Sequence, residues 1–227
     1  TKQEKNSQVS IVIDPFDGGC GLRAPSLEAE ILLVTHHHHD HDNIKAVKGT
    51  PFLIDGPGEY EIKGAFIQGI PSFHDDVQGK ERGINTIYTI EAEEIKLCHL
   101  GDFGQKELTG EQLEKIGNVE ILMIPVGGTY TIDSKLASNI ISQIEPKIVI
   151  PMHYELPRRK AAGHPSGQVL SSRSAGRKKI PKLLVKLEGV DKFLKTMGLK
   201  SVEPLNKLLI KKKDLSAEET KIVVLKP

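Results

Sequence analysis

The sequence contains no tryptophan, and aromatic residues make up only 4% of its 227 residues. We therefore do not expect aromatic stacking on bases or sugars to dominate ligand binding. The two cysteines, Cys20 and Cys98, are too few for a disulfide scaffold and do not show the CxxC spacing of a metal or redox motif. We expect both to be reduced thiols in a cytoplasmic protein.

The sequence also lacks a strong charge of either sign and any long apolar run. Lys and Arg number 31 and Asp and Glu 30, and the net charge of +1 excludes a protein that binds polyanions over its whole surface. No apolar run approaches the roughly 18 residues of a membrane span, so we expect no membrane partner. The hydrophobic content of 38% is typical of a globular protein, and the length suits a single domain over residues 1–227.

Short β-branched and apolar runs, separated by Gly and Pro, predict a chain rich in strands. A capping box at Thr109 and Gln112 begins one helix, Asp133 caps a second helix that Pro146 ends, and a third helix is expected at 190–197. This order predicts an α/β (α+β) fold in which sheets are layered between helices. The expected strands are 9–13, 30–35, 52–54, 59–62, 65–70, 85–91, 94–100, 120–125, 147–152, 208–210 and 221–225.

Residues 156–182 differ in composition from the rest of the chain. There is no Asp or Glu between Leu156 and Leu187, whereas Lys and Arg recur throughout, and the middle of the segment is rich in Gly, Ser and Ala. This composition predicts a flexible basic insertion. It is either a solvated loop or a clamp for phosphate or a nucleic-acid backbone.

Five of the nine histidines fall within six positions, directly after the apolar run ILLVT (31–35). Residues two apart on an extended segment point the same way, so His36 and His38 are expected to share a side. A turn then brings Asp40 and His41 to a second point, and this arrangement favours two metal ions on a rigid element. A purification tag, a solvated polar loop and a disordered metal-sequestering tract are alternatives, which the folded flanks of the run disfavour.

The segment from His36 to His41 resembles the HxHxDH motif of the metallo-β-lactamase superfamily. The segments IVIDPF (11–16), GPGEYEIKG (56–64), HLGDFG (99–104), IPVGGTYTID (124–133) and VIPMHYE (149–155) resemble the branch that contains L-ascorbate-6-phosphate lactonase-like proteins. The resemblance implies an αββα four-layer sandwich with a metal site at one edge of its two sheets.

The resemblance also implies a set of metal ligands, most of which follow predicted strands. One ion would be bound by His36, His38 and His74, and the other by Asp40, His41 and His153, with Asp102 bridging both. His37 and His39 alternate with ligand positions and are expected to point away, and His99 is expected to be structural.

The resemblance is incomplete in two places. Relatives usually begin with a strand before the IDPF strand, whereas only eight residues precede Val9, so we expect the fold to lack its first N-terminal strand and to expose a sheet edge. The basic segment after His153 is an insertion that could cover the site, contact phosphate or do neither.

The implied ligand set contains five His and two Asp and no Cys, which suits zinc, with manganese or iron as alternatives. We expect two divalent ions roughly 3.5–4 Å apart to hold a hydroxide at neutral pH, with Asp40 and Asp102 as the catalytic groups that orient it. The predicted function is a dinuclear metal-dependent hydrolase acting on a phosphodiester, lactone or related phosphorylated small molecule.

A glycine-containing loop is expected beside the metal ions and could bind an anionic substrate through its backbone N–H groups and the following helix start at Asp133. The alternative is a turn that needs glycine for its backbone angles. The candidate substrate-binding residues are Gly127, Gly128, Thr129, Tyr130 and Tyr154.

Other functions and partners remain open at this point. The chain could be a nuclease that holds RNA or single-stranded DNA with the basic residues 158–182, or a non-catalytic metal-binding protein. β-Lactam hydrolysis is conceivable as a side activity of an open dinuclear site. We also expect a homo-oligomer.

Overall fold

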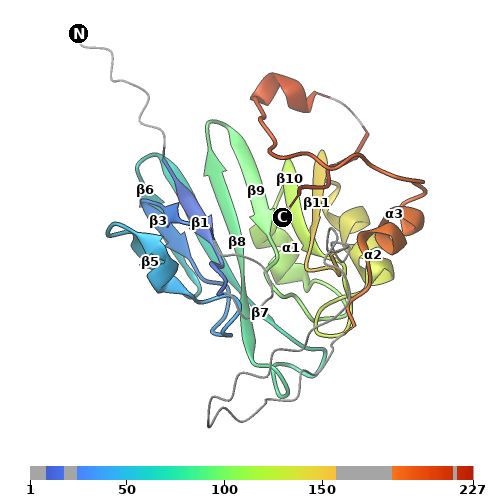
Figure 1. The fold of residues 1–227 in the computed structure, drawn as a ribbon, viewed down its shortest axis with the longest axis horizontal. Helices are drawn as coiled ribbons and strands as arrows, with labels where there is room; N and C mark the ends of the chain where they lie inside the picture. Colours follow the sequence, from blue (N-terminus) through green and yellow to red (C-terminus); the bar gives the residue numbers. More distant parts are fainter. Residues whose placement is uncertain (1–8, 18–24, 157–185, 217–218, 227) are drawn as a thin grey trace, which may run out of the picture.

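The computed structural model describes residues 9–17, 25–156, 186–216 and 219–226, and the arrangement of its elements is shown in Figure 1. The strands are β1 (Ile11–Ile13), β2 (Leu27–Glu28), β3 (Ile31–Leu33), β4 (Val47–Lys48), β5 (Phe52–Ile54), β6 (Gly58–Ile62), β7 (Ala65–Phe73), β8 (Ile84–Ala92), β9 (Ile95–His99), β10 (Ile121–Pro125), β11 (Ile148–Met152) and β12 (Lys221–Ile222). The helices are α1 (Gly110–Ile116), α2 (Ser134–Ile144) and α3 (Val190–Thr196), with 3-10 turns η2 (Ile44–Ala46) and η3 (Lys212–Leu215).

Two sheets form the centre of the fold. The large sheet has seven strands in the order β12-β11-β10-β9-β8-β7-β6. Its strands from β6 to β9 pair antiparallel, and those from β9 to β12 pair parallel. The small sheet has the order β1-β3-β5, and all its pairs are parallel. Parallel pairing matters for function because it collects the carboxyl ends of several strands at one edge.

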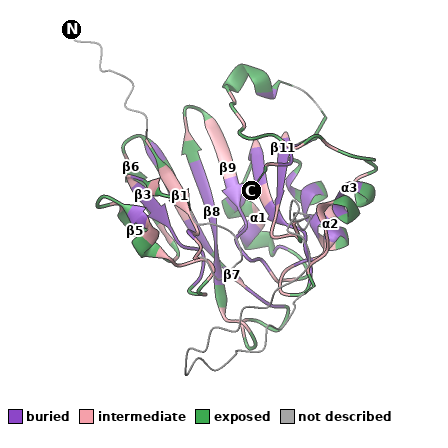
Figure 2. Cartoon of the chain, in the orientation of Figure 1, coloured by how far each residue is buried: buried purple, intermediate pink, exposed green. Residues whose placement is uncertain are grey.

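Apolar side chains cover both faces of the large sheet, and Figure 2 shows buried residues along its central strands. One core lies between the two sheets, where residues such as Ile31 and Leu33 of β3 meet Ile67 of β7 and Tyr88 of β8. A second core packs α1, α2 and α3 against the opposite face. Among the described residues, the outer face of the small sheet packs against residues of the short β2–β4 pair rather than against a long helix.

Local sequence signals set the helix ends. The Thr109 hydroxyl accepts a hydrogen bond from the Gln112 N–H, and the Gln112 side chain accepts one from the Thr109 N–H, so α1 begins with the predicted capping box. The Asp133 carboxylate accepts from two N–H groups at the start of α2, and Glu145 ends that helix in the left-handed region, immediately before Pro146.

Most predicted elements are present, with small shifts at their ends, but the strand expected at 208–210 is wrong. The segment has no partner strand among the residues that the structure describes. Leu208 and Ile210 pack on the large sheet, whereas Leu209 is 77% exposed. The alternation of burial therefore arises from a chain that crosses an apolar surface, not from backbone pairing.

The last predicted strand, 221–225, is shorter than expected. Lys221 and Ile222 form β12, and Leu225 forms an isolated bridge with Leu205. Most of the predicted basic insertion, residues 157–182, lies outside the described residues. No helix in the described part of the chain is long and apolar enough to cross a membrane.

Candidate metal centre

The predicted ligands converge where parallel strands end. His36 lies three residues beyond β3, Asp102 three residues beyond β9, and His153 directly after β11. His74 directly follows β7, which ends at the same edge. The topology of two sheets with aligned carboxyl ends thus brings four distant segments to one place.

One oxygen of Asp102 faces the imidazoles of four histidines in the cluster. Its Oδ2 atom lies 3.3 Å from His74 Nε2 and 3.3 Å from His153 Nε2. The same oxygen lies 3.6 Å from His41 Nε2 and 4.0 Å from His36 Nε2. The carboxylate is almost completely buried. A single oxygen that faces four imidazoles has the position required of a group that bridges two metal ions.

The histidine-rich turn sends alternate side chains inward. The rings of His36 and His38 lie 4.7 Å apart between centroids, and those of His36 and His41 lie 4.3 Å apart. The side chains of His37 and His39 are 60% and 80% exposed and point away, as the alternation predicts. This outcome follows from the period-2 geometry of an extended segment.

Two compact groups of ligand atoms match the two predicted halves of the site, and a third group, of Asp14, His36 and His41, spans both halves. Nitrogen atoms of His36, His38 and His74 lie within 4.8 Å of one another. Ligand atoms of His41, Asp102 and His153 also lie within 4.8 Å of one another. Six of the seven predicted metal-ligating residues are therefore brought into compact groups.

Asp40 occupies the rim of the cluster. Its Oδ2 atom is 3.9 Å from His41 Nε2, and its Oδ1 atom is 3.7 Å from the exposed His39. The Asp40 side chain is 38% exposed, and it belongs to neither compact group. Its role as a ligand and catalytic group stays a prediction.

Asp14 was not among the predicted ligands, yet it holds two parts of the histidine turn. Its carboxylate accepts hydrogen bonds from the Thr35 N–H (2.8 Å) and hydroxyl (2.7 Å), and its Oδ2 atom lies 3.2 Å from His41 Nδ1. The Thr35 hydroxyl lies 2.9 Å from His36 Nδ1. Asp14 directly follows β1, which is paired with β3, and this strand-end position was the signal that could have identified it.

Asn85 holds the Asp102 turn in place. Its Oδ1 atom accepts the Asp102 N–H at 2.9 Å, and its amide donates to the Ser72 hydroxyl (2.7 Å) and the Leu100 carbonyl (2.9 Å). Gly101 has φ of +58°, and a Cβ atom there would lie 2.3 Å from Asn85 Oδ1. Asn85 can therefore reach the turn only because residue 101 is glycine.

The buried charges shift several pKa values in opposite directions. Burial and the neighbouring histidines lower the pKa of His36 to about 3. Burial also opposes protonation of His41, but the hydrogen bond to Asp14 and the nearby carboxylates outweigh it and raise the pKa to about 9. Burial raises the pKa of Asp102, but hydrogen bonds from His153 and His74 outweigh it and hold the pKa well below its ordinary value. At neutral pH Asp102 is ionised and His36 is neutral, as metal ligands must be.

The free nitrogen atoms of the cluster fit a metal site. The Nε2 atom of His36 is fully buried and has no hydrogen-bond partner among the described residues. A buried polar atom without a partner is destabilising, and a bound cation would satisfy this one. The donor set, imidazole nitrogens around a central carboxylate, is suited to a divalent transition metal.

Comparison with known proteins agrees with this geometry. Residues 3–153 match the family model described as a β-lactamase superfamily domain, and the match ends at His153. The chain belongs to the metallo-β-lactamase superfamily. A structure from Thermotoga maritima, assigned to Zn-dependent hydrolases of this superfamily, is 34% identical with a TM-score of 0.67 over 96% of this chain and 89% of that one.

Curated relatives give the same result. A UPF0173 metal-dependent hydrolase of Thermococcus onnurineus is 30% identical over 63% of this chain and 76% of its own length. One from Thermoplasma volcanium is 31% identical over 64% of this chain and 76% of its own length. The predicted superfamily and fold are confirmed, and these relatives support the predicted metal-dependent hydrolase.

The predicted substrate loop of this superfamily member lies against a metal-ligand candidate. A Cβ atom on Gly127 would come within 2.0 Å of the His153 carbonyl, so glycine is required there for close approach. The N–H groups of Gly128 and Tyr130 donate to carbonyl groups of the same loop, and the Thr129 hydroxyl donates to the backbone carbonyl of Lys186. These N–H groups are therefore used internally, and the proposal that they bind an anion gains no support.

The two predicted tyrosines differ in their surroundings. Tyr154 packs against the helix-side core, and its hydroxyl donates to the Leu225 carbonyl at 3.4 Å. The ring of Tyr130 contacts Arg82, a residue that sequence reasoning did not select. Tyr130 therefore remains a candidate substrate contact, whereas the position of Tyr154 gives that role no support.

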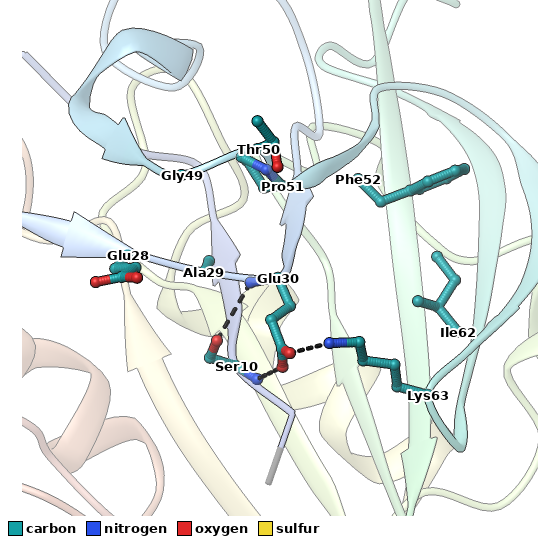
Figure 3. A pocket seen from close by; sticks show the side chains of 10 residues that line it. All are labelled: Ser10, Glu28, Ala29, Glu30, Gly49, Thr50, Pro51, Phe52, Ile62 and Lys63. Carbon is teal, nitrogen blue, oxygen red and sulfur yellow. Dashed lines mark hydrogen bonds and ion pairs between the residues drawn. The ribbon is translucent and has the colours of Figure 1, made fainter. Parts of the chain in front are cut away.

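A pocket in the structure lies away from the metal cluster. Figure 3 shows it around Ser10, Glu30 and Phe52, at the amino ends of the small-sheet strands, whereas Asp14 and His36 follow the carboxyl ends. Its Glu30 carboxylate pairs with Lys63 and accepts the Ser10 N–H, so these two opposite charges in the pocket neutralise each other. The pocket is not part of the candidate active site.

Proposed function

We propose that this chain is a dinuclear metal-dependent hydrolase that cleaves an anionic small molecule. The observation that carries the proposal is the position of Asp102 Oδ2, within 3.3–4.0 Å of four imidazole nitrogens from three other segments of the chain. Structural ion pairs in globular proteins seldom place one almost completely buried carboxylate oxygen among four histidines, because burial disfavours unpaired charge.

In this proposal, His36, His38 and His74 would hold one ion and His41 and His153 the other, with Asp40 as a further ligand. Asp102 would be the ligand shared by both ions. When bound, two divalent ions polarise a substrate oxygen and lower the pKa of a coordinated water towards neutrality. The chain itself fixes the histidines through Asp14 and Thr35 and excludes bulk water from the buried side of the cluster.

Zinc is the metal that we propose, with manganese and iron as the alternatives. The donors are imidazole nitrogens and carboxylate oxygens, and no thiolate contributes to the proposed ligand set. Cys98 is fully buried in the core between the large sheet and the helices, and the proposed site does not use it.

The substrate class that we propose is a phosphodiester, a lactone or a related phosphorylated small molecule. All three have an electrophilic centre with an oxygen that a dinuclear site can polarise, and a metal cluster favours an anion. The nuclease alternative depends on the basic residues 158–182, which lie outside the described part of the chain.

The proposal is tested by metal analysis and a substrate screen on the purified protein. Plasma emission spectrometry should find about two zinc ions per chain, as a dinuclear site requires. The zinc-loaded protein should turn over bis-p-nitrophenyl phosphate or a lactone, and nitrocefin and RNA complete the screen. An Asp40→Ala variant should lose most turnover and some zinc, because its carboxylate reaches the His41 side of the cluster.

Asp42→Ala is the matched control, since Asp42 lies two residues away and its carboxylate pairs with the outward-pointing His37. It should keep wild-type metal content and turnover. Full turnover by the Asp40→Ala variant would remove the assigned role of Asp40. An Asp102→Asn variant that still bound a full complement of zinc would refute the role of Asp102 as the ligand shared by the two ions.

A further inference from the structure

Arg82 lies on the face of a tyrosine ring beside the metal cluster. The guanidinium carbon of Arg82 is 4.2 Å from the centroid of the Tyr130 ring, and both residues are half-buried. A cation over an aromatic face is attracted by the ring and is held in a defined orientation. The planar fork of the guanidinium then has its N–H groups available at the edges.

The backbone of Arg82 is anchored next to His74. The Asp75 carboxylate accepts the Arg82 N–H at 2.8 Å, and also the N–H groups of Val77, Gly79 and Glu81. The next residue, Gly83, accepts the His74 N–H at 3.1 Å. Arg82 therefore rises from a loop that is hydrogen-bonded to His74 and to Asp75, the residue after it.

The loop that carries Tyr130 is anchored beside His153 and Phe103. Its loop contacts His153 through Gly127, and the Ile132 N–H donates to the Phe103 carbonyl, one residue beyond Asp102. The Arg82–Tyr130 contact thus joins the loops beside His74 and His153, whose Nε2 atoms both face Asp102 Oδ2.

Within the described part of the chain, the charge of Arg82 is not balanced by a carboxylate. Among the residues that the structure describes, no Asp or Glu lies within ion-pair distance of its guanidinium. Residues 157–185 contain no Asp or Glu at all. A half-buried cation near a site for metal cations is unfavourable alone, and an anion bound between them would offset the repulsion.

We propose that Arg82 and Tyr130 form a subsite for an anionic group of the substrate, a phosphate or carboxylate that is separate from the bond being cleaved. Tyr130 orients the guanidinium, and the guanidinium binds two oxygens of the anion as a fork. That the bound anion belongs to a substrate rests on the proposed hydrolase function. Binding of the anion does not depend on that function.

The subsite is tested by calorimetric titration of inorganic phosphate into the metal-free protein at neutral pH, with succinate as a second arm that tests carboxylate binding. Arg82→Gln should weaken binding roughly tenfold, the range expected when a charge-assisted hydrogen bond is lost. Arg82→Lys should bind with intermediate affinity because it keeps the charge but loses the fork. Tyr130→Leu should weaken binding while keeping the cation.

Lys80→Gln is the matched control, because Lys80 is an exposed cation of the same loop. It should bind phosphate as the wild type does. If Arg82→Gln binds phosphate with unchanged affinity, or if the wild type shows no saturable binding, the subsite is refuted. A lower melting temperature of Arg82→Gln with unchanged phosphate affinity would identify the pair as a structural link between two loops.

The outcome is independent of the hydrolase proposal. Loss of phosphate binding in Arg82→Gln, together with no turnover of any substrate by the zinc-loaded wild type, would refute the hydrolase and keep the subsite. If turnover exists, Arg82→Gln should raise KM for a substrate with an additional phosphate, with kcat little changed. For a substrate without that group, KM should stay at the wild-type value.

Discussion

Replacing Asn85 with alanine should loosen the turn that carries Asp102. The wild-type side chain makes three buried hydrogen bonds: to the Asp102 N–H, the Leu100 carbonyl and the Ser72 hydroxyl. Alanine removes all of them. The Ser72 hydroxyl keeps its bond to the backbone carbonyl of residue 85, but the Asp102 N–H and the Leu100 carbonyl lose these partners.

The expected cost follows from those two backbone groups. Each buried donor or acceptor left without a partner costs about 1–3 kcal/mol, so the variant should lose about 2–6 kcal/mol of unfolding free energy. That is a large share of the roughly 5–15 kcal/mol that stabilises a typical domain. A water molecule that enters the space would bring the loss to the lower end of this range. Zinc affinity should fall about 10–100-fold, as for other groups that orient metal ligands.

Urea unfolding monitored by circular dichroism measures the loss of unfolding free energy. Competition with a chelator measures the loss of zinc affinity. Asn206→Ala is the control, because Asn206 is exposed and its loss should leave stability and zinc affinity unchanged. A loss below about 1 kcal/mol in Asn85→Ala, with wild-type zinc affinity, would refute the assigned positioning role.

Three further outcomes are expected. In the metal-free protein the pKa of His41 is about 9, above its ordinary value of 6.5, because the bond to Asp14 and nearby carboxylates outweigh burial. The part of the unfolding free energy that comes from protonated His41 is therefore fully present below pH 6.5 and is lost as pH rises through 9. Zinc displaces this proton, so zinc affinity measured by chelator competition should increase from pH 7 to 9. Gly127→Ala should displace His153 and reduce the zinc content found by emission spectrometry. Gly128→Ala should reduce it less: the φ of +63° at this position strains an alanine, but the nearest atom to its Cβ is 3.6 Å away. Burial raises the pKa of Cys98 to about 12, so iodoacetamide at pH 8 should alkylate it only after unfolding, as peptide mass spectrometry would detect.

The histidine turn could be predicted from the sequence because its geometry is local. Residues two apart on an extended segment share a side, which is why His36 and His38 point inward and His37 and His39 do not. The motif resemblance supplied His74, Asp102 and His153, and the common strand end explains why these distant residues meet. Most strands were predictable from apolar runs because both faces of the large sheet are covered.

The supporting residues could not be predicted because their partners are distant in sequence. Asp14 binds Thr35, 21 residues away, and that pairing depends on the register of β1 and β3. The Arg82–Tyr130 contact depends on how two loops leave two different sheet strands. The error at 208–210 has a related cause, since apolar alternation reports which side chains are buried but not whether the backbone has a partner strand.

The hydrogen bonds that support the metal centre also connect the two sheets. Thr86 donates its N–H to the Thr35 carbonyl, and the Tyr88 hydroxyl donates to the Val34 carbonyl, so β8 of the large sheet is bonded to the segment that leads into His36. Asn85, which precedes Thr86 in β8, accepts a hydrogen bond from the Asp102 N–H. One strand therefore sets the distance between the two halves of the ligand set. Separating the sheets would move His36 away from Asp102, so metal binding to both should stabilise the inter-sheet core, because a ligand that binds only the folded state stabilises it.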